Sequence, residues 1–118
     1  MALERRLYGS RRTGTVAWLW QRVTAIVIGL GLLALGAALA LAGHLRYAVW
    51  QGVMASFPVR ILLFLWLLAI VIHAYLGIET ILKDYVHAPF VRLGMQAGAL
   101  LVLLGLLAFG AMVFVTWR

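Results

Sequence analysis

Three long stretches of the chain contain no lysine, arginine, aspartate or glutamate, and they limit strongly what it can fold into. They cover residues 23–45, 61–78 and 93–117, which are 23, 18 and 25 residues long. About 20 apolar residues cross the hydrocarbon core of a bilayer as a helix. The middle stretch reaches that length by including residues 57–59 and 79–82. The pattern therefore predicts three membrane-spanning helices.

The overall composition supports a membrane protein. The 118 residues are 66% hydrophobic and 11% charged, whereas a soluble domain is about a quarter charged. Only helices and closed barrels satisfy their backbone hydrogen bonds in lipid, and continuous apolar runs without alternation exclude a barrel. We expect an all-α membrane protein with one domain, residues 1–118, in which helices at about 23–45, 58–82 and 93–117 follow a basic N-terminal segment, 1–22.

The basic residues indicate how the chain is oriented, because lysine and arginine gather on the cytoplasmic side of membrane proteins. With three helices, the N-terminal segment and the second loop share one side. That side holds seven basic residues: Arg5, Arg6, Arg11, Arg12, Arg22, Lys83 and Arg92. The other side holds Arg46, Arg60 and Arg118. We therefore expect a cytoplasmic N-terminus in a multi-pass protein of the bacterial inner membrane.

Several other classes of protein are excluded. A polar, arginine-rich stretch of 22 residues precedes the first full-length span, so a secretory signal is not expected. The chain has no cysteine, which removes disulfides, cysteine-ligated iron–sulfur clusters and cysteine nucleophiles. Its net charge of +7 is explained by membrane topology, since no soluble domain is present that would bind nucleic acid.

The candidate functional residues lie mainly on the second predicted helix. His73 lies deep inside an apolar run, and an ionisable residue in a membrane span is a functional-site hypothesis by default. Histidine is a common ligand for metals and haem iron. Asp84 and Tyr85 follow where the run ends, at the membrane surface where Arg22 begins the first span. We therefore expect Arg22, Asp84 and Tyr85 to meet at one depth.

The other histidines are poorly placed to share a ligand with His73. His44 lies at the opposite end of the first span, roughly 15–20 Å from His73 in depth at about 1.5 Å per residue, and His87 lies at the surface. A second axial histidine for a haem must therefore come from another polypeptide. Gly77, Thr80 and Asp84 follow His73 on nearly one helical face, where Gly77 would leave space for a flat macrocycle or a close helix.

Each candidate also has an ordinary structural interpretation. His73 can form a hydrogen bond between helices, and Asp84 can be a solvated charge at the interface. Tyr85 can belong to the aromatic belt of the membrane surface, and Arg22 can be one more cytoplasmic positive charge. The combination of these residues is more informative than any one of them.

Two motifs contain the candidates. The first span opens on Trp20-Gln21-Arg22-Val23-Thr24-Ala25, and the second contains His73-x3-Gly77-x6-Asp84-Tyr85-Val86-His87. They resemble the Trp-x-Arg-x-Thr-Ala opening and the haem-and-quinone segment of the small hydrophobic membrane-anchor subunit of succinate dehydrogenase, the succinate:quinone oxidoreductase called complex II. The resemblance covers nearly the whole chain.

The resemblance implies a role for each candidate. His73 matches the histidine that supplies one axial ligand to haem b, the other coming from the larger cytochrome b anchor subunit. Tyr85 matches the tyrosine that binds a quinone carbonyl, and Asp84 matches an acidic neighbour that assists proton delivery. Arg22 falls where the family places a basic residue near the haem propionates or the quinone pocket.

The resemblance also implies partners. Flavoprotein and iron–sulfur subunits would oxidise succinate, which this chain cannot do itself, and the anchor would attach them to the membrane. We expect a partner of several helices to complete a four-helix-like core around the haem.

Two alternatives remain open at this point. One is an anchor of a fumarate reductase or of a haem-free complex II variant. The other is a small membrane transporter or scaffold without a redox role. A transporter would favour an acidic residue in an early span, and none lies between Arg22 and Arg46. A pure scaffold would not need His73 together with Asp84 and Tyr85.

Overall fold

The computed structural model describes residues 11–43 and 46–117, with side chains from residue 14 onwards. Its helices are α2 (Arg11–Ala42), α3 (Tyr47–Ala55), α4 (Phe57–Tyr85) and α5 (Pro89–Thr116). Three helical segments, Gly14–Ala42, Phe57–Tyr85 and Pro89–Thr116, are long and apolar enough to cross a membrane. The prediction of an all-α protein with three membrane-spanning helices is confirmed. Arg5, Arg6, His44 and Arg118 lie outside the described residues.

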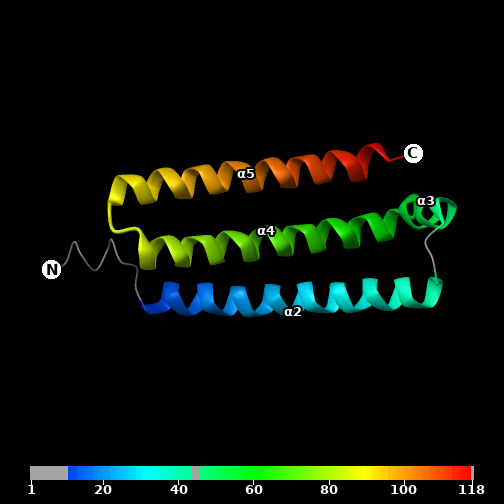
Figure 1. The fold of residues 1–118 in the computed structure, drawn as a ribbon, viewed down its shortest axis with the longest axis horizontal. Coiled ribbons are helices and arrows are strands. Elements are labelled where there is room, and N and C mark those ends of the chain that lie inside the picture. The colour runs from blue at the N-terminus through cyan, green and yellow to red at the C-terminus, as the bar shows by residue number, and fades with distance from the viewer. Residues whose placement is uncertain (1–10, 44–45, 118) are drawn as a thin grey trace.

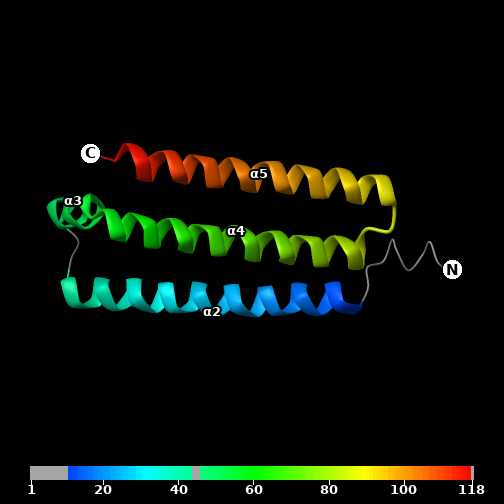
Figure 2. The same ribbon diagram turned by 180° about the vertical axis from the view of Figure 1, so that it is seen from behind.

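The three long helices lie side by side, with α4 in the middle (Figure 1). Helix α4 contacts α2 on one side and α5 on the other, whereas α2 and α5 do not contact each other in the described part of the chain. The view from behind shows the same order (Figure 2). The beginning of α2 and the turn between α4 and α5 lie at one end, which we call the Tyr85 end. Helix α3 and the end of α5 lie at the other, the Arg60 end.

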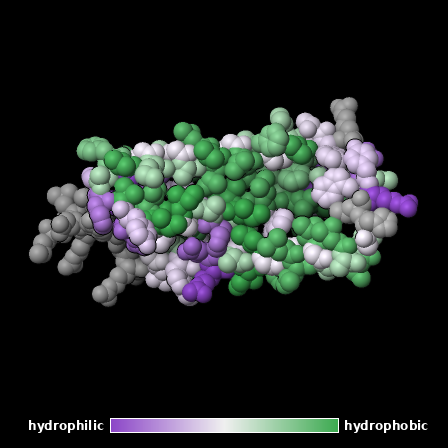
Figure 3. Space-filling model, in the orientation of Figure 1, coloured by the Kyte–Doolittle hydropathy of each residue, from purple (hydrophilic) through white to green (hydrophobic). Residues whose placement is uncertain are grey.

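The surface of this layer is suited to lipid and to other membrane helices. Most large apolar side chains of the described helices are exposed, and very few are buried. Figure 3 shows apolar surface over the middle of the layer and hydrophilic side chains toward its two ends. In water this exposure would be costly, but lipid tails are as apolar as leucine side chains. The fold therefore needs a membrane, and it leaves broad faces for partner helices.

The helix boundaries differ from the predicted ones at two places. Helix α2 begins at Arg11 rather than at residue 23, and the short helix α3 was not predicted. At about 1.5 Å per residue, the 32 residues of α2 are about 48 Å long, beyond the roughly 30 Å of a hydrocarbon core. Charged residues mark where an apolar stretch ends, but backbone hydrogen bonds continue a helix past that point into polar surroundings.

Proline and glycine mark several helix ends. Pro58 and Pro89 lie in the first turns of α4 and α5, where the missing backbone N–H would have no partner inside the helix. Gly43 follows α2 directly and has a φ of 66°, a left-handed conformation that ends a helix and favours glycine.

Helices α2 and α4 approach closely where a tryptophan lies against a glycine. The indole Nε1 of Trp66 donates a hydrogen bond to the carbonyl oxygen of Ile28 at 3.3 Å. The same ring occupies the space that a Cβ on Gly31 would need. Small residues allow membrane helices this kind of close packing.

Gly31→Ala is therefore expected to destabilise the contact between α2 and α4, by about 1–3 kcal/mol for an overpacked contact. The matched control is Gly36→Ala on the same helix, where no atom lies within 4 Å of the added Cβ. Alanine is the better helix former, so the control should be neutral or slightly stabilising. Unfolding of both proteins in detergent tests this, and equal stability of the two variants would contradict it.

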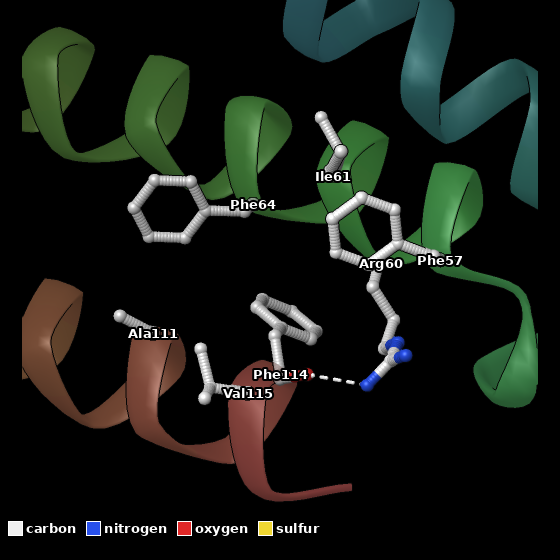
Figure 4. A pocket seen from close by; sticks show the side chains of 7 residues that line it. All are labelled: Phe57, Arg60, Ile61, Phe64, Ala111, Phe114 and Val115. Atoms are coloured by element: carbon white, nitrogen blue, oxygen red, sulfur yellow. Dashed lines mark hydrogen bonds between the residues drawn. The ribbon is translucent and has the colours of Figure 1, made fainter.

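Arg60, near the start of α4, holds the end of α5. Its Nη1 donates to the carbonyl oxygen of Phe114 at 3.0 Å and to that of Trp117 at 3.4 Å. Carbonyl groups at the end of a helix lack intrahelical donors, so Arg60 supplies one. An apolar cavity of about 360 Å³ lies beside it between α4 and α5, with Phe57 and Phe64 in its lining (Figure 4). This cavity is at the Arg60 end, away from Asp84 and Tyr85.

Candidate functional site

The imidazole ring of His73 is held against α2 through one of its two nitrogens. Its Nδ1 lies 3.2 Å from the carbonyl oxygen of Gln21 and 3.1 Å from Oγ1 of Thr24. A carbonyl oxygen can only accept a hydrogen bond, so Nδ1 carries the proton and donates it. In the neutral ring, Nε2 therefore keeps its lone pair.

Nε2 of His73 has no hydrogen-bond partner within the described residues, and it is not fully buried by the chain. The His73 ring is half-buried and lies 12 residues before the end of α4, about 18 Å along the helix axis. An unpartnered polar atom in an apolar span costs free energy. A bond from Nε2 to a metal would satisfy it, and metal-bound histidines usually donate their other ring N–H to an oxygen acceptor. The donor set of His73 therefore fits a haem iron.

Among the described residues, no three metal-ligating side chains form a group. His87 lies in the loop that follows α4 and is exposed, 14 positions from His73. Within the described residues, His87 is thus too far along the chain to share a ligand with His73. A six-coordinate iron would need its other protein ligand from a different subunit.

Asp84 and Tyr85 are the last two residues of α4, and both are exposed. The Tyr85 side chain is 79% exposed, so its hydroxyl is accessible to a molecule outside the chain. The ammonium group of Lys83 pairs with Glu79 at 2.8 Å and not with Asp84. Asp84 has no ion pair with any of the described side chains, although a lysine precedes it in the sequence.

Arg22 does not lie at the depth of Asp84 and Tyr85, and that expectation was wrong. The carbonyl of the preceding residue, Gln21, contacts His73, which places Arg22 at the depth of the histidine. Tyr85 is about 18 Å further along α4, at 1.5 Å per residue. The cause is the early start of α2, whose first three turns run alongside the end of α4. The guanidinium of Arg22 lies over the Trp18 ring, 4.9 Å from its centroid.

The face of α4 that carries His73 and Gly77 packs against α2. The side-chain amide of Gln21 lies 3.9 Å from the position that a Cβ on Gly77 would take. The sequence predicted that Gly77 would leave space for a flat macrocycle or for a close helix. In this chain, helix α2 lies close to Gly77. Thr80, further along the same face, is exposed and donates to the carbonyl oxygen of Leu76 at 2.9 Å.

The sequence matches the family described as the succinate dehydrogenase/fumarate reductase transmembrane subunit over residues 1–115. The chain belongs to this family. It is also similar to the succinate dehydrogenase hydrophobic membrane anchor subunit of Coxiella burnetii (strain RSA 493 / Nine Mile phase I). The two are 28% identical over 94 residues, which cover 80% of this chain and 82% of the relative. The predicted resemblance to a complex II anchor is thus confirmed, and the three apolar helices make the chain a multi-pass membrane protein.

Sequence reasoning missed two partners of His73 in this anchor-family chain. Gln21 and Thr24 belong to the motif that opens the first span, but only Arg22 of that motif was given a role. The hydrogen bonds join residues 52 and 49 positions apart, so no local pattern indicates them. A threonine among apolar residues of a span was the available signal, because its hydroxyl needs an acceptor there.

Proposed function

We propose that this chain is the membrane-anchor subunit of a succinate:quinone oxidoreductase and that His73 supplies one axial ligand to haem b. The observation that supports this best is the free Nε2 of a histidine whose Nδ1 is anchored to α2. The larger cytochrome b subunit would supply the second ligand and cover the open faces of the helix layer. Bound haem would accept and return one electron at a time. Arg22, at the depth of His73, is suited to a haem propionate.

Tyr85 and Asp84 form part of the proposed quinone-reduction site. Reduction of a quinone to a quinol consumes two electrons and two protons. The Tyr85 hydroxyl donates a hydrogen bond to a quinone carbonyl oxygen and stabilises the negative charge that develops there. The carboxylate of Asp84, which has no ion pair among the described side chains, relays protons from the aqueous side. Both side chains are exposed at the end of α4, so partner subunits complete the pocket around them.

Partners are required because this chain holds no group that could oxidise succinate. Without cysteine, it cannot ligate an iron–sulfur cluster through thiolates. Flavoprotein and iron–sulfur subunits therefore dock at the Tyr85 end, where α2 begins, and the basic N-terminal segment would provide contacts. A quinone bound beside Tyr85 would receive electrons from them, and a haem held by His73 would supply a one-electron centre.

A reduced-minus-oxidised visible spectrum of the complex purified through this chain tests the proposal. A b-type haem band together with a co-purified flavoprotein is the expected result. A flavoprotein without the band would favour a haem-free complex II variant. Absence of both would contradict the proposal. The direction of the reaction distinguishes a succinate dehydrogenase from a fumarate reductase, and the steady-state rates in both directions measure it.

The orientation predicted from the arginines can be tested separately, because the chain has no cysteine of its own. Single cysteines would replace Ala88, in the loop at the Tyr85 end, and Gln51, on α3 at the Arg60 end; both positions are exposed. With a cytoplasmic N-terminus in the bacterial inner membrane, a membrane-impermeant maleimide should label Gln51→Cys in intact spheroplasts. It should label Ala88→Cys only after lysis. The opposite pattern would reverse the topology.

A further inference from the structure

Thr24 has no role in the proposed function, yet it is the polar residue that the described chain buries most completely. Its relative exposure is 3%, and it is the one buried polar or charged residue among those described. Its Oγ1 lies 2.8 Å from the carbonyl oxygen of Trp20 and 3.2 Å from that of Gln21. It also lies 3.1 Å from Nδ1 of His73.

The directions of these hydrogen bonds follow from the available protons. Nδ1 of His73 donates, because the Gln21 carbonyl beside it can only accept. A hydroxyl has one proton and two lone pairs, so Thr24 gives its proton to a backbone carbonyl, with Trp20 the nearest, and accepts from Nδ1. The result is a short chain of hydrogen bonds from the imidazole to the hydroxyl to the backbone of α2. Such chains polarise each member and strengthen one another.

We infer that Thr24 is a positioning residue for the haem ligand, acting through Nδ1 of His73. This inference rests on the proposed haem ligation. Thr24 is a second acceptor beside Gln21, so it holds the ring plane and keeps the proton on Nδ1. The hydrogen bond from Nδ1 to Thr24 also polarises the N–H bond, which makes Nε2 a stronger electron donor. A stronger donor favours the ferric over the ferrous iron, so the intact hydrogen bond lowers the haem midpoint potential.

The competing explanation is purely structural. Threonine in a helix often bonds to the carbonyl four residues earlier and packs through its methyl group. The chain offers a matched control, since Thr116 makes the same bond, to Met112 at 2.7 Å, on an exposed part of α5. Thr24→Val keeps the volume and removes the hydroxyl, whereas Thr24→Ser keeps the hydroxyl and removes the methyl group.

Redox titration of the haem band in the purified complex tests the inference on wild type, Thr24→Val, Thr24→Ser and Thr116→Val. The potential of Thr24→Val should move to more positive values. At the wild-type midpoint potential, the ratio of reduced to oxidised haem in this variant should rise about two- to tenfold. That change corresponds to the free energy of one hydrogen bond. Thr24→Ser and Thr116→Val should match the wild type. Loss of haem from Thr24→Val alone, with the subunits still assembled, would also support the inference.

Three results would overturn it. An unchanged potential in Thr24→Val with full haem content would show that the hydroxyl does not act on the ligand, and His73 could still bind the haem. A shift of similar size in both Thr24 variants would assign the effect to the packing of the side chain rather than to its hydroxyl. A wild-type complex without haem would overturn the proposed ligand role as well, so the two failures can be distinguished.

Discussion

Replacing His73 with alanine is expected to abolish the b-type haem band of the purified complex. The ring nitrogen Nε2 is the one group on the described chain whose surroundings suit an axial ligand. The other nitrogen already donates to the Gln21 carbonyl and to Thr24. Alanine removes the proposed ligand and leaves a space beside α2, so a haem bound as proposed would lose one of its two axial ligands. Difference spectra at equal protein concentration measure the loss.

His87→Ala is the matched control for this experiment. His87 is exposed in the loop after α4 and lies 14 positions from His73, too far along the chain to replace it. The control should keep the full band. A full band in His73→Ala would contradict the ligand assignment, whatever its effect on the activity of the complex.

Replacing Tyr85 with phenylalanine is expected to slow quinone reduction while the haem band stays unchanged. The substitution removes one hydroxyl from an exposed side chain and should leave the fold intact. Removal of one donor to a developing oxyanion costs on the order of 100-fold in rate. Succinate oxidation with a soluble electron acceptor does not use this site, so that rate should stay at the wild-type value.

Tyr47→Phe provides the comparison for Tyr85→Phe, because Tyr47 is also exposed but lies on α3 at the Arg60 end. It should reduce quinone at the wild-type rate. If Tyr85→Phe did the same, Tyr85 would have no role in the reaction and would be an ordinary aromatic residue of the membrane surface.

The two substitutions act at different depths, which the structure makes clear. His73 and Tyr85 are about 18 Å apart along α4 at 1.5 Å per residue. The His73 ring contacts the backbone of α2, whereas the Tyr85 side chain is exposed at the end of α4. Loss of haem and loss of quinone reduction should therefore be separable by mutation.

The sequence by itself determined the fold class and the candidate residues. Runs of 18–25 residues without charge leave no option but membrane-spanning helices, because a lipid interior gives the backbone no other hydrogen-bond partner. The same property makes a histidine in such a run conspicuous, so His73 was identified without any structure. The unequal depths of the three histidines also predicted that no second one on this chain could share its ligand.

Only the tertiary structure decided how the helices pair and what holds the histidine. Helix ends depend on backbone hydrogen bonds rather than on charge, so the sequence missed the first three turns of α2. It therefore placed Arg22 at the depth of Tyr85 instead of that of His73. The contacts of His73 with Gln21 and Thr24 cross between two helices. Apolar faces of similar composition could pack in several rotations, and the specific hydrogen bonds and the Trp66–Gly31 contact select one of them.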